Sequence, residues 1–227
     1  MALLFLVRHG QASFGTADYD RLSDLGRQQA RWLGEYFAAR GLTFRRAVAG
    51  SLKRQRDTAS EILAAMGADL AVHEHAGLNE YHGEALYTAH TGGRDPLSHQ
   101  RADYRDYWRT LKAAMAAWTE DRLAGVPETW ADFGARMRAG IDLACDGLAR
   151  EDAALVVSSG GAIARAMVDI IGCNGATAVE FNLQFRNSGF VELIVSGDAA
   201  ARAMRLVAFN AIPHVDTPER RHAITFT

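Results

Sequence analysis

Short apolar runs alternate with helical apolar stripes over the first third of the chain. Residues 3–7 are five apolar residues in a row, which predicts a short strand buried on both faces of a sheet. An amphipathic helix is predicted between Ser23, whose side chain suits an N-cap, and Gly41. Two further strands are predicted at residues 44–50 and 70–76, with a second helix between them. This order of strands and helices is typical of a parallel sheet in an α/β protein.

The pattern changes in the middle of the chain. Residues 77–127 contain no strand-like run, and a helical stretch is predicted from about residue 99 to residue 123. We therefore expect a helical cap insertion at about residues 80–127, placed after the third strand and over the carboxyl edge of the sheet. Thr129 is a predicted N-cap for a helix over residues 130–149.

The sheet resumes in the last third of the chain. Residues 153–158 predict a buried strand, which ends at a predicted turn formed by Gly160-Gly161. A helix of small residues is predicted over residues 162–171, and residues 190–196 and 204–210 predict an antiparallel pair of strands. We interpret the whole chain as a single α/β domain that carries the cap.

The composition is that of an ordinary globular protein. The 227 residues are enough for one large domain with an insertion, and 48% of them are apolar against 23% charged. The formal net charge of −2 gives no reason to expect nucleic acid or an anionic membrane as a partner. Binding of an anion would therefore need a local cluster of Arg and His.

Redox and targeting features predict a cytoplasmic protein. Cys145 and Cys173 are the only cysteines and lack the spacing of a disulfide framework, which fits a reducing compartment. The apolar start is interrupted by Arg8-His9, so we interpret it as a strand and not as a signal peptide. No apolar run in the sequence approaches the roughly 20 residues that span a bilayer.

Arg8-His9-Gly10 follows the first strand, at the edge of the sheet where α/β proteins bind ligands. A neutral imidazole is a nucleophile that can accept a phosphoryl group, and a guanidinium donates hydrogen bonds to phosphoryl oxygens. Gly10 would let the backbone approach closely. A metal ligand and a chance pairing on the surface are the two alternatives for this Arg-His pair.

A basic cluster opens the second helix, for which Ser51 is the predicted N-cap. Positive charge at a helix N-terminus opposes the helix dipole unless an anion is bound there. Arg54 and Arg56 cannot share one helix face, so only one of them is expected to point into a site. Glu80 and Glu84 follow the third strand, and both are candidate proton donors. The alternatives without a functional role are a solvated helix face for the arginines and exposed loop positions for the two acids.

The remaining strand ends add weaker candidates. Ser159-Gly160-Gly161 follows the fourth strand, where a Gly-Gly turn before a helix can hold phosphate with backbone N–H groups, although it can equally be a plain turn. His214 follows the last strand and can reach the same edge. His73 and His75 share one face of a strand, but no third ligand is placed beside them, so we expect no metal.

Taken together, these segments resemble the histidine phosphatase superfamily, also called the phosphoglycerate mutase-like family. Residues 8–11 look like its Arg-His-Gly signature, and residues 22–30 look like its Leu-Ser-x-x-Gly-x-x-Gln-Ala helix start. Leu52, Arg54, Thr58 and Ala59, within residues 51–59, resemble the motif that carries the clamp arginine, which favours Arg54 over Arg56. Residues 78–80 resemble the segment with the general acid, which favours Glu80 over Glu84.

The resemblance implies a three-layer α/β/α sandwich around a mostly parallel sheet, with a cap after the third strand. It also implies a phosphomonoester hydrolase that works through a phosphohistidine on His9. Arg8, Arg54, Ser159 and Gly160 would bind phosphate, while Glu80 would serve as general acid and base. The mechanism needs no metal and no organic cofactor. The expected partner is a small phosphorylated substrate or inorganic phosphate. The question whether the chain forms a homodimer is left open.

The sequence departs from the family at two positions. Ser159 stands where the family usually has a second histidine, and Gly15 stands where many relatives carry an Asn. Losing a charge-assisted hydrogen bond costs roughly 1.5–3 kcal/mol, or about 10- to 150-fold in rate. A weakened or inactive relative that binds phosphate esters is therefore the main alternative, and a phosphoglycerate mutase ranks below it. Further candidates for the site are Gln11, Ser13, Glu84, His82 and His214, of which either His82 or His214 would replace the missing cation.

Overall fold

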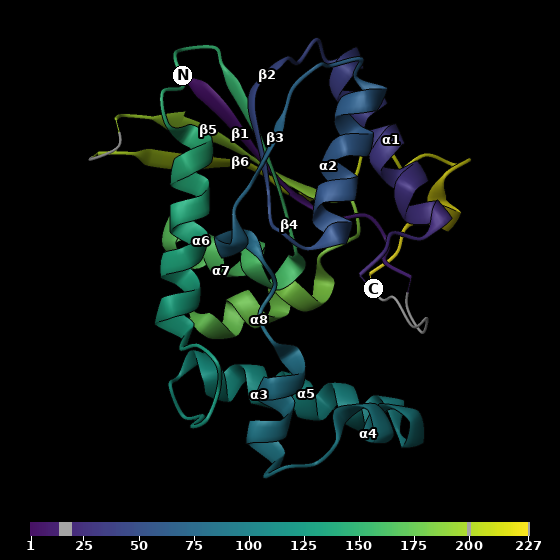
Figure 1. Cartoon of the computed structure of the whole chain (residues 1–227), viewed down its shortest axis with the longest axis vertical. Helices are drawn as coiled ribbons and strands as arrows, with labels where there is room; N and C mark the ends of the chain where they lie inside the picture. The colour runs from purple at the N-terminus through teal and green to yellow at the C-terminus, as the bar shows by residue number, and fades with distance from the viewer. Residues whose placement is uncertain (14–19, 199–200, 227) are drawn as a thin grey trace.

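A six-stranded sheet forms the centre of the protein in a computed structural model, which describes residues 1–13, 20–198 and 201–226. Its strand order is β3-β2-β4-β1-β5-β6 (Figure 1). The strands are β1 (Ala2–Arg8), β2 (Phe44–Ala49), β3 (Val72–Glu74), β4 (Ala153–Ser158), β5 (Phe190–Ser196) and β6 (Ala203–Ala211). The first four are mutually parallel, whereas β5 runs antiparallel to both of its neighbours. The predicted mixed, mostly parallel α/β fold is confirmed.

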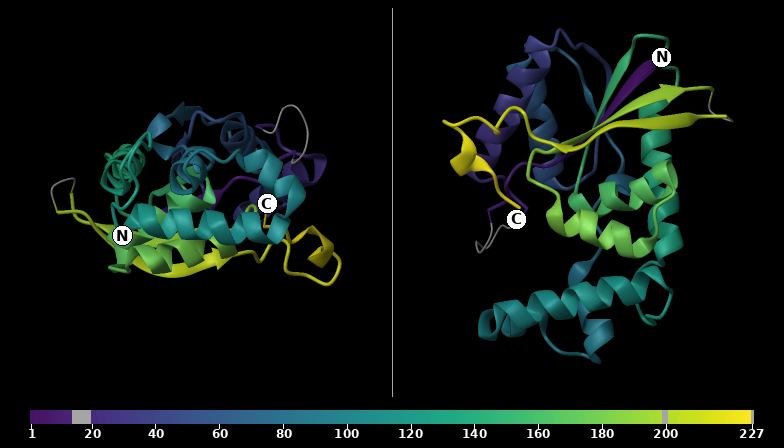
Figure 2. Two further views of the ribbon diagram at one scale, coloured as in Figure 1. Left: turned by 90° about the horizontal axis from the view of Figure 1, so that it is seen from below. Right: turned by 180° about the vertical axis from the view of Figure 1, so that it is seen from behind.

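Helices cover both faces of this sheet (Figures 1 and 2). One face carries α1 (Asp24–Ala39) and α2 (Lys53–Ala65), and the other carries α6 (Trp130–Cys145) and α7 (Gly160–Ile171), with α8 (Gly175–Gln184) packed on α7. Successive side chains of β1 enter opposite layers because a strand alternates its faces. Phe5 packs with the α1 and α2 side, and Leu6 packs with the α6 and α7 side. This double burial explains the unbroken apolar run at the start of the chain.

The cap region consists of α3 (Gly83–Thr91), α4 (Pro96–Ala102) and α5 (Tyr104–Thr119), which lie together beyond one edge of the sheet (Figure 1). The sequence predicts a single helical stretch at residues 99–123, whereas the structure divides this region at Asp103. That residue ends α4, and its carboxylate accepts a hydrogen bond from the Asp106 backbone N–H at 2.9 Å, which starts α5. Among the described helices, none combines the length and apolar character needed to cross a bilayer.

Several predicted boundaries are wrong for local reasons. β3 is shorter than residues 70–76, because it is an edge strand that pairs only with β2 and gives way to the 3-10 helix η1 (Ala76–Leu78). Ser51 does not cap α2, since its hydroxyl accepts a hydrogen bond from Asn79 instead. Gly160 and Gly161 form the first turn of α7 and not a separate turn.

Four elements are absent from the sequence-based prediction, namely the helices α3 and α8 and the 3-10 helices η1 and η2. Asn174 starts α8 by accepting a hydrogen bond from the Thr177 backbone N–H at 2.9 Å. The helix was hidden because its apolar positions form no clear stripe. A second 3-10 helix, η2 (Arg221–Ala223), lies in the C-terminal tail. By contrast, the predicted N-caps Ser23 of α1 and Thr129 of α6 are confirmed, and Thr129 also forms a capping box with Asp132.

Candidate active site

His9 follows β1 directly and is buried, with 4% of its surface exposed. Its Nδ1 lies 2.7 Å from the Gly10 carbonyl oxygen. A carbonyl oxygen can only accept, so Nδ1 carries the proton. The other nitrogen, Nε2, accepts a hydrogen bond from Arg54 Nε at 3.1 Å and therefore presents its lone pair. His9 is thus a neutral imidazole with its nucleophilic nitrogen turned toward a guanidinium.

The surroundings of His9 hold it in this neutral form. Burial is the largest cause that lowers the pKa of His9 well below its usual value, and the positive charges of Arg54 and Arg8 lower it further. The hydrogen bond to the Gly10 carbonyl opposes them but does not reverse the direction. A nucleophilic imidazole is therefore available at neutral pH and also on the acidic side of it.

Arg54 lies in the first turn of α2 and links His9 to Asp20. Its Nη1 is 2.7 Å from Asp20 Oδ1, and Asp20 Oδ2 accepts from the Lys53 backbone N–H at 2.8 Å. A carboxylate therefore lies at the basic N-terminus of α2, where the helix dipole favours negative charge. Arg56 points away and pairs with Glu74 on the surface. As helical spacing predicts, the two arginines point in different directions, and only Arg54 contacts His9.

Glu80 lies after η1 and beside the start of α7. Its Oε2 accepts from the Gly161 backbone N–H at 3.1 Å, and Oε1 accepts from the Tyr81 backbone N–H at 3.2 Å. Burial raises the pKa of Glu80, although both backbone N–H groups, Arg54 and Arg8 oppose this rise. A carboxyl group in this setting is suited to carry and donate a proton. A side chain at 161 would displace its neighbours, because a Cβ there would lie 2.4 Å from Tyr81 Cε1 and 2.5 Å from Glu80 Oε1.

Arg8 and the start of α7 complete the cluster. The Arg8 guanidinium donates to the Phe185 carbonyl, and a Cβ on Gly160 would lie 3.5 Å from Arg8 Nε. Ser159 is the N-cap residue of α7 and is fully buried. Its hydroxyl accepts a hydrogen bond from Gln55 Nε2 at 2.8 Å. The carboxyl ends of β1 and β4 thus meet the starts of α2 and α7 on one side of the sheet.

Arg136, on α6, holds the loop that carries Glu80. Its Nη1 donates to the Gly77 carbonyl at 2.9 Å and to the Asn79 carbonyl at 2.7 Å. Glu128 neutralises the guanidinium at 2.6 Å, and the Phe133 ring packs beneath it at 4.4 Å. Arg136 has no motif in the sequence, because its partners on the loop are backbone carbonyls, which any residue supplies.

For the phosphomonoester hydrolysis that the resemblance implies, replacing Arg136 with lysine is expected to lower kcat by about tenfold or more while KM changes little, because an ammonium cannot span the same carbonyls and Glu80 loses its fixed position. Steady-state kinetics on a phosphate monoester measure both constants. Arg138→Lys is the matched control, since Arg138 lies on the same helix, is 59% exposed and pairs with Asp169. Equal kcat values for the two variants would contradict a positioning role for Arg136.

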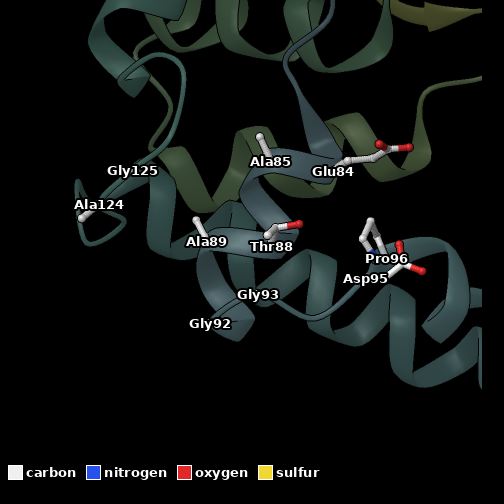
Figure 3. Close-up of a pocket in the computed structure, with 10 residues that line it drawn as sticks. All are labelled: Glu84, Ala85, Thr88, Ala89, Gly92, Gly93, Asp95, Pro96, Ala124 and Gly125. Carbon is white, nitrogen blue, oxygen red and sulfur yellow. The ribbon is translucent and has the colours of Figure 1, made fainter.

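Other predicted candidates lie outside this cluster. Glu84 is exposed in the first turn of α3, where it lines a cavity of about 540 Å³ with Thr88 and Asp95 (Figure 3). His82 is exposed and precedes α3 without a side-chain capping bond. Neither residue is brought to the ends of β1 and β4 by a described hydrogen bond or ion pair.

His214 is buried but supports the backbone of His9. Its Nε2 lies 2.7 Å from Ser188 Oγ, and the Ser188 backbone N–H donates to the His9 carbonyl at 3.2 Å. Burial, assisted by Arg220, lowers the pKa of His214 to about 3. His214 is therefore neutral at physiological pH and supplies no positive charge in place of a second histidine.

The loop after His9 is tied to α1. The Gln11 backbone N–H donates to Gln29 Oε1 at 2.8 Å, and Gln11 Oε1 accepts from Ser23 Oγ at 2.8 Å. The Ser13 backbone N–H donates to the Arg21 carbonyl at 2.7 Å. Gly15, the second departure from the family pattern, lies outside the described residues.

The described residues contain no group of three or more His, Cys, Asp or Glu side chains that could hold a metal ion. His73 is exposed on β3, and His75 accepts a hydrogen bond from the Gly77 backbone N–H at 3.1 Å. These two histidines therefore have separate surroundings in the structure.

Comparison with known proteins identifies the family. A model of the histidine phosphatase superfamily (branch 1) matches residues 4–206. The chain belongs to this superfamily. Members of the histidine phosphatase superfamily include phosphatases and mutases, and the relatives below represent both. Among curated proteins, none matches the chain significantly.

Several solved structures of phosphatases and of a mutase share the fold. The structure of a mycobacterial glucosyl-3-phosphoglycerate phosphatase with VO3 is 26% identical, covers 92% of this chain and 99% of its own, and superposes with a TM-score of 0.64. A phosphoserine phosphatase from Entamoeba histolytica with 3-phosphoglyceric acid is 20% identical over 94% and 99%, with a TM-score of 0.65. A Bacillus anthracis phosphoglycerate mutase is 18% identical over 94% of both chains, with a TM-score of 0.62.

Proposed function

We propose that this protein is a phosphomonoester hydrolase that works through a phosphohistidine on His9. The observation that carries the proposal is the pair of contacts at His9, in which Nδ1 faces the Gly10 carbonyl and Nε2 faces the Arg54 guanidinium. Glu80 supports the proposal, because its carboxyl group has a raised pKa and lies close enough to Arg54 and Arg8 for their charges to affect that pKa. A nucleophile, cations and a proton donor are the parts that phosphoryl transfer requires.

The proposed reaction has two steps. First, His9 Nε2 attacks the phosphorus, the bond to the ester oxygen breaks, and Glu80 gives its proton to the leaving alkoxide. Second, the Glu80 carboxylate takes a proton from water as the water oxygen attacks the phosphohistidine, which releases phosphate and restores His9. Arg8 and Arg54 neutralise the phosphoryl oxygens in both steps, and Ser159 and the Gly160 backbone N–H bind them. No metal or organic cofactor takes part.

A protein that binds phosphate esters without hydrolysing them is the second candidate. Ser159 favours it, because a hydroxyl brings no positive charge to the place where the family pattern has a histidine. Calorimetry with inorganic phosphate, combined with an assay of phosphate release, separates the two candidates. Binding without release from any ester supports the second one.

The hydrolase is tested with a panel of small phosphate monoesters that includes sugar phosphates, phosphoserine, 3-phosphoglycerate and p-nitrophenyl phosphate. We expect release of inorganic phosphate from at least one ester, together with a protein-bound phosphate that is labile in acid and stable in alkali. Absence of release from every ester, with no labelled protein, would overturn the proposal.

The rate is expected to depend on pH mainly through Glu80. Its raised pKa means that the carboxyl group keeps its proton, and so its activity as an acid, into the range where an ordinary glutamate is ionised. The value of kcat/KM should therefore decline as pH rises through the pKa of Glu80. Because the pKa of His9 is lowered, no acidic limb is expected near pH 6.5. A profile corrected for substrate ionisation checks this, and an acidic limb at about 6.5 would contradict a neutral buried His9.

A further inference from the structure

Two neighbouring residues of α2 each contact the end of a different central strand. Arg54 donates to the side chain of His9, which follows β1, and Gln55 donates to the side chain of Ser159, which follows β4. β1 and β4 are paired in parallel, with Arg8 opposite Ser158, and the His9 backbone N–H donates to the Ser158 carbonyl at 2.9 Å. His9 and Ser159 therefore follow directly after a paired position in the sheet.

The hydrogen bonds of Gln55 fix the direction of its amide. Nε2 lies 3.2 Å from the Leu78 carbonyl oxygen and 2.8 Å from Ser159 Oγ. The Leu78 carbonyl can only accept, so this end of the side chain is the NH2 group. It follows that Ser159 Oγ accepts from Gln55, and that the hydroxyl proton of Ser159 points elsewhere. Within the described residues, no side chain or backbone group is found to accept that proton.

The way in which Gln55 contacts Ser159 carries a cost in folding free energy. Gln55 is fully buried, and its Oε1 finds no hydrogen-bond partner within residues 1–13, 20–198 and 201–226. A buried carbonyl oxygen without a partner is unfavourable. Gly50 makes room for it, since a Cβ at that position would overlap with Gln55 Oε1. The side chain is thus held by its NH2 end alone.

We propose that Gln55 is a positioning residue that acts through Ser159, by holding the serine hydroxyl as a hydrogen-bond donor to a phosphoryl oxygen at His9. The proposal rests on the proposed function and adds to it a group that does not touch the substrate. An ordinary serine hydroxyl rotates freely and both donates and accepts. With its acceptor side engaged by Gln55, the hydroxyl of Ser159 is left to donate.

The test is a double-mutant cycle with Gln55→Met, Ser159→Ala and the combined variant. Methionine fills a similar volume without a donor. Each single substitution is expected to lower kcat/KM by roughly 10- to 100-fold, since a hydrogen bond to a charged oxygen is lost or misdirected. The combined variant should be no slower than Ser159→Ala, because Gln55 acts only through Ser159. The affinity for vanadate, measured by calorimetry, should follow the same pattern.

A control separates positioning from structural support. Ser158 is equally buried, and its hydroxyl donates to the same Leu78 carbonyl at 2.6 Å. Ser158→Ala should lower the free energy of unfolding in urea by about as much as Gln55→Met does. Its kcat/KM should stay within about twofold of wild type. Losses of kcat/KM that multiply in the combined variant, or a Gln55→Met variant as fast as wild type, would overturn the proposal.

The cycle also distinguishes failure of this inference from failure of the proposed function. If the wild type hydrolyses no ester, the proposed function fails, and the vanadate affinities of the four proteins still report whether Gln55 acts through Ser159. If the wild type is active and the cycle is additive, the hydrolase stands and the role of Gln55 is wrong.

Discussion

Replacing His9 with alanine is expected to abolish phosphate release, with a loss of at least about 10³-fold in kcat, because no other described residue offers a deprotonated nitrogen beside Arg54. The protein-bound phosphate should disappear as well. The measurement is rapid mixing with a ³²P-labelled ester, quenching in alkali and counting of the label that stays on the protein.

The control for this prediction is His73→Ala, which removes an exposed imidazole from β3. This variant should keep both the turnover and the acid-labile label. A His9→Ala protein that is folded, as judged by its urea unfolding midpoint, and still forms the label would exclude His9 as the phosphoryl acceptor. Such a result would direct attention to another nucleophile at the same edge of the sheet.

Replacing Glu80 with glutamine is expected to lower kcat on alkyl phosphates by about 10²- to 10⁴-fold, since proton transfer to the leaving oxygen is lost. An aryl ester behaves differently. The p-nitrophenolate leaving group is stable without a proton, so phosphorylation of His9 should stay fast, whereas the activation of water should be slow. Stopped-flow absorbance should therefore show a burst of p-nitrophenol close to one equivalent per protein, followed by slow turnover.

Glu84→Gln is the matched control for Glu80, because Glu84 lies four residues on, is exposed and lines the cavity in the cap. We expect no burst and little change in kcat for this variant. If Glu80→Gln slows alkyl and aryl esters equally and shows no burst, Glu80 acts on neither the leaving group nor water. If the Glu84 variant shows the burst instead, the assignment of the two carboxyl groups is reversed.

The sequence predicts those parts of the fold and of the site that follow from the spacing of apolar and polar residues within one element. The double burial of β1 follows from its unbroken apolar run, and the opposite directions of Arg54 and Arg56 follow from helical spacing. Helix starts with a clear capping residue, such as Ser23 and Thr129, are also predicted correctly. In each case, the information lies within a few residues of the element concerned.

The features that the sequence does not predict depend on contacts between distant segments. Gln55 meets Ser159 across 104 positions, and Arg136 meets Gly77 across 59. Neither contact leaves a local pattern, because one partner is a lone hydroxyl and the other is a backbone carbonyl. The shortening of β3 has a similar origin, since its position at the sheet edge is a property of the whole sheet. Likewise, the lowered pKa of His214 comes mainly from tertiary burial, which the residues around it in the sequence do not show.

The hydrogen bonds from Arg136 to backbone carbonyls have a consequence for how the sequence of this protein can vary. Gly77, Asn79 and Glu80 offer the guanidinium their carbonyl oxygens, which every amino acid possesses. An exposed side chain of this segment, such as His82, can therefore be exchanged over evolutionary time without loosening the attachment. Selection can reshape the surface next to the cap for new leaving groups while Glu80, the proposed proton donor, stays in place. The backbone carbonyls thus hold the segment in place, and exposed side chains beside it remain free to vary.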